Sequence, residues 1–155
     1  MDEKLRIILI IIVSVSIFGL LVFVFVKNYI KTKLKYYLKE KNKDIKVYLS
    51  DPTGSALYNY IKNGELKSEG ESITEGIGSS RVTKNFATAK IDGAFSISDK
   101  ESLPIVFDLI QNEGLSLGTS SGVNIAGAIR LGKELGPGKT IITILCDKSD
   151  RYNSK

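Results

Sequence analysis

The sequence predicts an α/β fold preceded by one transmembrane helix, and three observations carry this prediction. Residues 7–26 form a charge-free apolar run, IILIIIVSVSIFGLLVFVFV. Beyond it, short strand-like segments alternate with amphipathic segments. Residues 140–146 (TIITILC) form an uninterrupted run rich in β-branched residues, which is typical of a strand buried on both faces of a parallel sheet. We therefore expect part of a three-layer α/β/α domain with a mostly parallel sheet.

The apolar run at residues 7–26 meets the length requirement for a membrane span. A spanning helix needs about 20 predominantly apolar residues. A secretory signal peptide is the alternative, but its apolar core is about 7–15 residues long and ends in small residues suited to cleavage. This run is longer and ends in VFVFVKN. We therefore expect an uncleaved anchor after a short N-terminal tail at residues 1–6.

The net charge of +5 is concentrated beside this predicted anchor. Residues 27–46 hold eight lysines and two acidic residues, whereas residues 47–155 are close to neutral and give no indication of nucleic-acid binding. Because lysines near a span favour the cytoplasmic side, we expect a single-pass membrane protein whose C-terminal domain is cytoplasmic. Residues 27–43 are expected to form a lysine-rich juxtamembrane helix. Its lysines serve either as a topology signal or as a contact for anionic lipid.

The absence of histidine excludes several classes of site. Catalysis by Ser-His-Asp or Cys-His arrangements and histidine-ligated metals are ruled out. The single cysteine, Cys146, cannot form an intramolecular disulfide, and a structural zinc site is effectively excluded. Cys146 ends an apolar run, so we expect a buried structural thiol. No metal site and no catalytic residue are predicted.

The domain is expected to begin at residue 44. Residues 45–50 alternate like a short strand, and residues 51–54 (DPTG) indicate a turn before a short helix at residues 55–62. Residues 65–85 are polar and rich in glycine. A loop of that length in a small domain is usually functional or disordered.

Regular structure is predicted again from residue 94. Residues 94–97 are expected to form a strand, and Ser98 and Glu101 have the spacing of a capping box at the start of a helix. The apolar stripe of that helix recurs at helical spacing and consists of Leu103, Val106, Phe107 and Ile110.

The last predicted elements are a short strand at residues 115–117, a helix, and the strand at residues 140–146. Ser120 or Ser121 is expected to cap the helix, and Gly136 to end it.

Two glycine-rich segments are candidates for a ligand site. Residues 74–78 (TEGIG) permit positive φ angles and close backbone approach. Residues 114–124 (GLSLGTSSGVN) lead into a helix N-terminus, where free amides suit polar or anionic groups. Taken singly, a plain loop and a helix cap are sufficient explanations of the two segments.

Read together, longer segments carry a family resemblance. SDPTGSALYNYIKNGELKSEGESITEGIG, IDGAFSISDKESLPIVFDLIQNEGLSLGTSSGVNIAGAIRLGKELGPGKTIITILCD and RYNSK resemble, in this order, the C-terminal part of bacterial cysteine synthase. That enzyme belongs to the pyridoxal-phosphate-dependent (fold type II) family that includes cystathionine β-synthase and the tryptophan synthase β chain. The resemblance runs from about Tyr37 to Lys155, and it covers about the last third of a family member. It identifies residues 44–155 as part of such a domain.

The resemblance implies roles for three residues. Ser120 takes the place of the serine that hydrogen-bonds the pyridine nitrogen of pyridoxal phosphate, and Gly76 and Gly78 line the substrate side of the cofactor. A neutral hydroxyl at Ser120 would leave the ring nitrogen largely unprotonated and limit its electron withdrawal. Thr119 departs from the glycine or aliphatic residue that is common in the family.

The resemblance also implies that parts are missing. Nothing in the sequence corresponds to the family's Schiff-base lysine or to its phosphate-binding loop. We therefore expect a membrane-anchored, truncated cysteine-synthase-like protein that is inactive alone. The family reaction is the replacement of the acetate of O-acetylserine by sulfide, which gives cysteine.

Two alternatives stay open. The chain could be a non-catalytic, membrane-tethered interaction or regulatory module. Its partner would then be a complementary synthase chain, or a second copy in a homodimer, that covers its apolar faces and open sheet edge. The chain could also be the product of a gene remnant.

Overall fold

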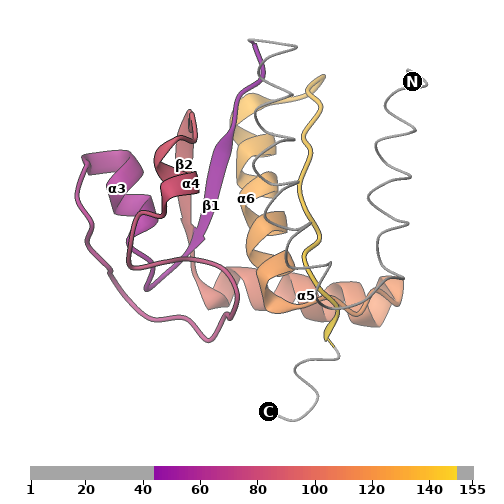
Figure 1. Cartoon of the computed structure of the whole chain (residues 1–155). Helices are drawn as coiled ribbons and strands as arrows, with labels where there is room; N and C mark the ends of the chain where they lie inside the picture. The colour runs from indigo at the N-terminus through magenta and orange to yellow at the C-terminus, as the bar shows by residue number, and fades with distance from the viewer. Residues whose placement is uncertain (1–43, 150–155) are drawn as a thin grey trace, which may run out of the picture. The chain divides into compact units, whose positions relative to one another are not determined.

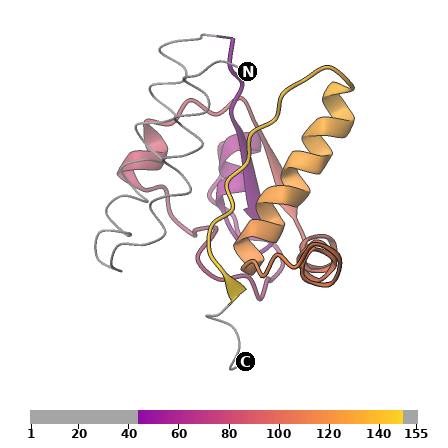
Figure 2. The same ribbon diagram turned by 90° about the vertical axis from the view of Figure 1, so that its right-hand side faces the viewer.

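The computed structural model describes residues 44–149 of the chain. The elements in this range are β1 (Tyr48–Pro52), α3 (Leu57–Asn63), α4 (Lys84–Ala87), β2 (Gly93–Ile97), α5 (Asp99–Glu113) and α6 (Thr119–Leu135). The two strands lie between α3 and α6, and α5 packs against α6 (Figures 1 and 2). This arrangement confirms the predicted α/β fold.

The predicted N-terminal tail, membrane span and lysine-rich helix all lie outside the described residues. Within residues 44–149, no helix is both long enough and apolar enough to cross a bilayer.

The sheet consists of β1 and β2, which pair in parallel as the sequence predicts. The register runs from Tyr48 opposite Gly93 to Pro52 opposite Ile97. Gly93 makes room for a ring, because a Cβ there would lie 2.7 Å from Cε1 of Tyr48. The Tyr48 ring stacks on Phe95 with centroids 5.9 Å apart. The strand pair is therefore fixed by backbone pairing and by this aromatic contact.

The core is small and lies where α6 meets the sheet. Ile97, Val123 and Ala126 are each no more than 1% exposed. Partly buried hydrophobic residues pack against this cluster from the loop, β2 and α5, and they are Ile77, Phe95 and Ile105.

Two glycines let α6 approach its neighbours closely. A Cβ at Gly122 would lie 2.7 Å from the backbone oxygen of Ser102 on α5. A Cβ at Gly127 would lie 2.1 Å from Oγ of Ser50 on β1. That hydroxyl instead donates a hydrogen bond of 2.7 Å to the Val123 carbonyl. The path of α6 thus depends on these two small residues.

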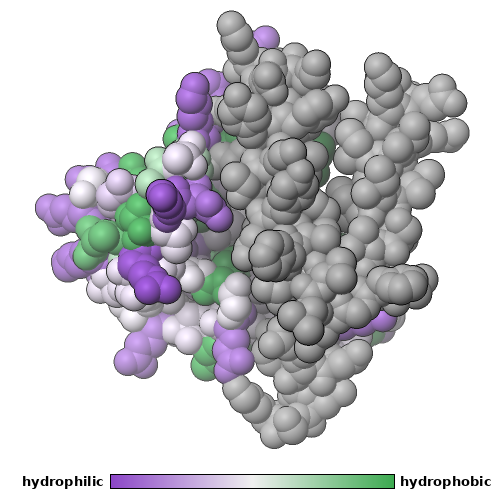
Figure 3. All heavy atoms as spheres, viewed as in Figure 1, coloured by the Kyte–Doolittle hydropathy of each residue, from purple (hydrophilic) through white to green (hydrophobic). Residues whose placement is uncertain are grey.

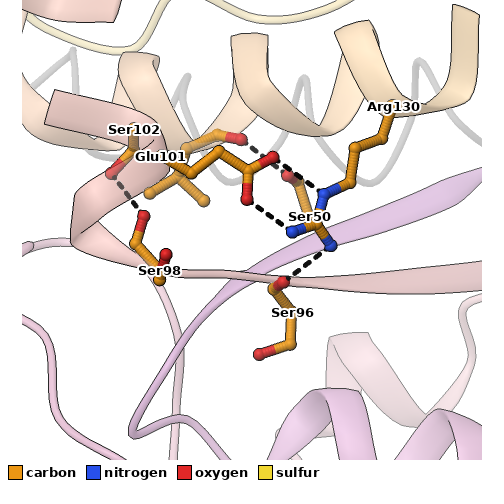
Figure 4. Close-up of polar contacts among 7 residues, drawn as sticks. Ser50, Ser96, Ser98, Glu101, Ser102 and Arg130 are labelled. Carbon is orange, nitrogen blue, oxygen red and sulfur yellow. Dashed lines mark hydrogen bonds and ion pairs between the residues drawn. The ribbon is translucent and has the colours of Figure 1, made fainter. Parts of the chain in front are cut away.

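A guanidinium group links α6, α5 and β2 (Figure 4). Arg130 Nε and Nη2 donate to the two carboxylate oxygens of Glu101 at 2.8 and 2.5 Å, and Nη1 donates to the Ser96 carbonyl at 3.0 Å. The predicted capping box is confirmed only in part. Ser98 is the N-cap of α5, but its side chain makes no capping bond. The carboxylate of Glu101 pairs with Arg130 instead, because a two-pronged, charge-assisted contact is stronger than a bond to a backbone amide.

Two predicted strands are absent from the described part of the chain. Leu117 forms only an isolated antiparallel bridge with Lys148. Residues 140–146 run alongside α6 without joining a sheet (Figures 1 and 2). In this segment Ile142 is 73% exposed and Leu145 is 52% exposed. The run has the composition of a strand buried on both faces, but the described sheet offers it no neighbouring strand.

The face that carries α3 and α4 has an ordinary surface. Hydrophilic residues predominate there, and hydrophobic residues are scattered among them (Figure 3). No special explanation is needed for such scattered hydrophobic residues.

Candidate functional site

The first candidate segment lies at the N-terminus of α6. The helix begins at Thr119, and its N-cap is Gly118. Ser120 and Ser121 lie in the first turn, and they are 3% and 0% exposed. The prediction that one of them caps the helix is therefore wrong. Their hydroxyls form hydrogen bonds with residues 146 and 147 instead of with the amides of their own helix.

A carboxylate lies beside the predicted cofactor residue. Ser120 Oγ donates to Asp147 Oδ1 at 3.0 Å. The position of Asp147 is fixed by its neighbours, because the Gly118 amide donates to the Asp147 carbonyl at 2.8 Å. The Cys146 amide donates to Ser121 Oγ at 2.9 Å. Sequence reasoning missed Asp147. The available signal was an acidic residue directly after a predicted strand, where side chains at the sheet edge commonly serve a site.

Next to this pair, the Thr119 hydroxyl is buried and has no hydrogen-bond partner among the described residues. A buried polar atom without a partner is uncommon, and a ligand or water normally satisfies it. Two hydroxyls and a carboxylate therefore lie together at the N-terminus of α6. Thr119 stands where the proteins that the sequence resembles commonly have glycine or an aliphatic residue, so its hydroxyl is an additional polar group here.

The second candidate segment is the glycine loop at residues 74–78. Gly76 and Gly78 have φ angles of 77° and 81°, which favour glycine. A Cβ at Gly78 would also lie 2.9 Å from Cγ of Pro52. Beyond the loop, Ser79 N donates to Ser55 Oγ at 2.9 Å, and that hydroxyl donates to the Ser79 carbonyl at 3.1 Å. The loop is thereby held against the C-terminal end of β1.

An aspartate anchors the other end of this loop. Asp99, the first residue of α5, accepts hydrogen bonds from Ser72 Oγ at 2.5 Å, Ile73 N at 2.9 Å and Thr74 Oγ1 at 3.3 Å. Charge-assisted bonds of this kind are stronger than neutral ones. Gly76 lies between the anchors at residues 72–74 and 79, and a Cβ added at Gly76 would have no neighbouring atom within 4 Å. The loop is therefore fixed at both ends and open at its tip.

A cavity of about 440 Å³ lies between this loop and residues 52–55. Gly78 lines it, whereas Gly76 and Ser120 are not among its lining residues. Ile77 also lines the cavity, and it packs on the core cluster that contains Val123. The structure thus brings the glycine loop close to the helix that carries Ser120, but it does not place the three predicted residues in one cavity.

Asp51 is a buried carboxyl group that sequence reasoning also missed. It is 1% exposed at the end of β1. Oδ2 accepts a bond of 2.7 Å from the Tyr58 amide, whereas Oδ1 is buried without a hydrogen-bond partner. Burial raises the pKa of Asp51, and the Ser55 hydroxyl and the Tyr58 amide offset part of that rise.

The remaining chemical groups define no further site. Within residues 44–149, no cluster of histidine, cysteine, aspartate and glutamate could hold a metal ion. The sequence predicts a buried structural thiol at Cys146, whereas the structure shows it half-buried. Its sulfur accepts from Asn124 Nδ2 at 3.3 Å.

The family model described as pyridoxal-phosphate dependent enzyme matches residues 35–147. The chain belongs to this family. The family's cofactor is pyridoxal phosphate, as the resemblance implied. The matched range includes both candidate segments and Asp147.

Individual relatives agree with this membership. A cysteine synthase of Dictyostelium discoideum is 40% identical over 129 residues, and the match covers 77% of this chain and 34% of that protein. Cysteine synthase 2 of Schizosaccharomyces pombe is 40% identical over 132 residues, with 77% and 33% covered. These relatives are eukaryotic, whereas we expected a bacterial cysteine synthase. The chain spans about a third of their length, as the resemblance predicted.

Solved structures share the fold. The O-acetylserine dependent cystathionine beta-synthase of Helicobacter pylori matches with a TM-score of 0.70 and 34% identity. The match covers 80% of this chain and 38% of that one. The α/β architecture with a parallel sheet is therefore that of a pyridoxal-phosphate-dependent family member.

Proposed function

We propose that this protein is a membrane-anchored, cysteine-synthase-like protein that supplies the ring-nitrogen side of a pyridoxal phosphate site. The buried Ser120 hydroxyl carries the proposal, because the helix N-terminus and residues 146–147 fix it on a polar edge. When bound, pyridoxal phosphate supplies an electron-withdrawing ring that eases loss of a proton and of a β-substituent from an amino acid. The residues of this chain bind and orient that ring.

The substrate class follows from the relatives. Two of them are named cysteine synthases, and the structural relative is named O-acetylserine dependent. We therefore assign the site to the family reaction, in which sulfide replaces the acetate of O-acetylserine.

We further propose that the chain does not complete this reaction alone. A lysine that binds the cofactor covalently must be desolvated and positioned at the cofactor carbonyl. Every lysine between residues 44 and 149 is exposed. Ser120 can position a ring, but within these residues no lysine side chain has the environment needed to attach it.

The test uses the full chain in a mild detergent with pyridoxal phosphate, O-acetylserine and sulfide. We expect no cysteine and no covalent attachment of cofactor after borohydride reduction. The cysteine synthase of Dictyostelium discoideum serves as the positive control in the same buffer. Cysteine formation by the chain alone would overturn the proposal of inactivity.

Anchoring by residues 7–26 is part of the proposal. The apolar run supports it, and the lysines at residues 27–46 support a cytoplasmic C-terminal domain. We expect the chain to stay in the membrane pellet after alkaline carbonate extraction. In sealed right-side-out vesicles, we expect the domain to resist added protease. Release by carbonate would refute the anchor, and digestion in intact vesicles would refute the orientation.

A second candidate function is complementation of another synthase chain, and the segment at residues 140–146 favours it. Its residues have strand composition, pair with no strand in the described part of the chain, and include Ile142, Ile144 and Leu145 at 73%, 45% and 52% exposure. A polypeptide that adds a parallel strand would cover these side chains.

Co-expression of the full chain with a tagged cysteine synthase from the same cell tests complementation. We expect the two chains to purify together, and Ile142→Asp to abolish the association while Lys133→Asp leaves it intact. Purification of the chain as a monomer or as a homodimer, without the synthase, would count against this function.

A further inference from the structure

Helix α6 contacts two extended segments that do not pair with each other. Toward β1, Ser50 Oγ donates to the Val123 carbonyl at 2.7 Å. Toward residues 140–146, Asn124 Nδ2 donates to the Ile144 carbonyl at 2.9 Å. Among the residues that the structure describes, the sheet contains only β1 and β2, and residues 140–146 join no strand. One helix therefore covers two neighbours that lack a backbone link.

The two contacts lie on different sides of α6. Residues 140–146 lie against Ser121, Asn124 and Gly132, whereas β1 lies against Gly127. At about 3.6 residues per turn, the two sets point in directions about 100° apart. A helix about 10 Å wide is as broad as three strands at a spacing of about 4.8 Å. The separation therefore fits β1, residues 140–146 and one strand between them, a place that we call the interstrand position.

Both segments that flank the interstrand position run in the same direction, opposite to that of α6 (Figures 1 and 2). Contacts of residues 140–146 agree with this direction. A Cβ at Gly132, late in the helix, would lie 3.4 Å from Ile141 Cδ1, whereas Cys146 N donates to Ser121 Oγ in the first turn. A strand at the interstrand position would therefore continue the parallel sheet that β1 and β2 begin.

The edge of β1 that faces this position is available for pairing. β1 lies between β2 and residues 140–146 (Figures 1 and 2). Thr53 N donates to the Ile97 carbonyl of β2 at 3.0 Å, and backbone groups along a parallel strand alternate between its two edges. The amides of Tyr48 and Ser50 are therefore directed to the opposite edge. Within residues 44–149, no strand pairs with that edge.

The surroundings of the interstrand position select an uncharged occupant. Residues 119–129 of α6 and residues 140–145 carry no ionisable side chain. Ile142 is 73% exposed. The carboxylate of Asp51 on β1 is bound to the Tyr58 amide of α3. Because a charge buried without a partner is costly, and because strands buried in parallel sheets are continuously apolar, the position fits an apolar strand.

The relatives indicate a source for such a strand. The match to the Helicobacter pylori structure covers 80% of this chain but 38% of that one, so most of that chain lies outside the match. A partner of the same family is therefore long enough to supply a strand beyond the part that it shares with this chain.

We propose that a cysteine synthase chain donates one apolar, parallel strand to the interstrand position, between β1 and residues 140–146. This inference rests on the second candidate function, complementation, and adds the place at which the partner enters. Pairing at the outer edge of residues 140–146 would leave the Tyr48 and Ser50 amides uncovered. A strand at the interstrand position covers both flanking segments at once.

Hydrogen exchange measured by mass spectrometry tests the place of entry. The full chain in mild detergent is compared alone and after co-purification with a tagged cysteine synthase from the same cell. In the complex, we expect the amides of Tyr48, Ser50 and residues 141–145 to exchange about tenfold more slowly or less. Exchange in α4, on the face that carries α3, should not change.

A matched pair of substitutions checks that the lining of this position is responsible. Ile144 is 45% exposed beside it, and Ile110 on α5 is 40% exposed. Ile144→Lys places a charge against the incoming strand and should remove the slow exchange at both flanking segments. Ile110→Lys, the same change at similar exposure, should leave it in place. Circular dichroism of both variants checks that the fold is retained.

The outcomes separate the inference from complementation itself. A complex in which only residues 141–145 exchange slowly overturns the inference and leaves complementation standing. Slow exchange at Tyr48 and Ser50 in the chain alone, as a monomer or a homodimer, also overturns it, because the position is then filled without a synthase. Slow exchange on phosphatidylglycerol vesicles without a synthase would assign the surface to lipid and overturn it as well. Failure of the two chains to purify together overturns both the inference and complementation.

Discussion

The loop at residues 65–80 and the segment at residues 140–149 are both irregular, but they are held in different ways. Asp99 binds three groups of the loop, and Ser55 binds its far end through two bonds to Ser79. The C-terminal segment depends on side chains of α6 and leaves isoleucines exposed. A polar loop can satisfy its hydrogen-bonding groups within one domain, whereas an apolar strand needs neighbouring strands to pair its backbone and cover its side chains.

Both regions depend on the contact between α5 and α6, so the largest effect is expected there. Gly122→Ala would place a Cβ 2.7 Å from the Ser102 carbonyl oxygen and 2.6 Å from Cγ2 of Val106. Overpacking of this kind should cost about 3 kcal/mol of unfolding free energy, measured by urea denaturation of the full chain. Gly132→Ala in the same helix is the control. Its nearest neighbour, Ile141 Cδ1, lies 3.4 Å away, so it should be neutral or slightly stabilising. Equal effects of both substitutions would contradict this view of the helix contact.

The polar anchoring of the loop predicts the next effect. Asp99→Asn removes the charge that holds Ser72, Ile73 and Thr74, and it leaves one oxygen in place of the two that accept their hydrogen bonds. We expect a loss of about 2 kcal/mol and faster hydrogen exchange at residues 71–80. Asp108→Asn on the same helix changes an exposed carboxylate that accepts a hydrogen bond from Asn112 Nδ2 at 2.7 Å, so it should leave that exchange unchanged. If Asp99→Asn left exchange in the loop unaltered, the loop would be held by something other than this carboxylate.

The link between α6 and α5 predicts a smaller effect. Glu101→Gln weakens the two bonds to Arg130, whose side chain is 42% exposed, so water screens much of the attraction. We expect a loss of about 1 kcal/mol that shrinks at high salt. Glu134→Gln, an exposed change in the last turn of α6, should have no such salt-dependent cost. A Glu101→Gln effect independent of salt would argue for a packing role.

These differences also define what could be predicted from the sequence. The parallel strands, the long helices and the glycines with positive φ follow from local pattern and turn chemistry, and they were predicted within a few residues. Ser120 was found because a family motif marks it. Asp99 and Asp147 were not found, because their roles depend on residues that lie 25 to 27 positions away along the chain.

The two wrong strand predictions have one physical cause. The composition of residues 140–146 is suited to burial between neighbouring strands, and such composition says nothing about whether those neighbours belong to the same chain. Likewise, Ser98 and Glu101 have capping-box spacing, but Arg130 competes for the carboxylate. Local sequence patterns indicate which structures a segment is able to form, and contacts with residues far away in the sequence determine which of them it forms.

The buried carboxyl group of Asp51 on β1 predicts a gain in stability when it is replaced. Burial raises the pKa of Asp51, so its contribution to stability is fully present at pH below the unfolded pKa and is lost as pH rises through the folded pKa. At neutral pH, Asp51→Asn keeps an acceptor for the Tyr58 amide and removes this cost. We expect a gain of roughly 1 kcal/mol or less that disappears on acidification. A loss at neutral pH would mean that the charged form makes a favourable contact.

The smallest expected effect is the sharpest test of the comparison. Ile142→Thr changes a side chain that is 73% exposed, so the unfolding free energy should change by less than about 0.5 kcal/mol. Ile97→Thr makes the same change at a fully buried site on β2 and should cost about 2 kcal/mol or more. Equal costs would show that residues 140–146 are already buried within this chain, which would remove the contrast between the two regions. A cost at Ile142 that emerges only when a synthase chain is present would instead locate the missing neighbour in that partner.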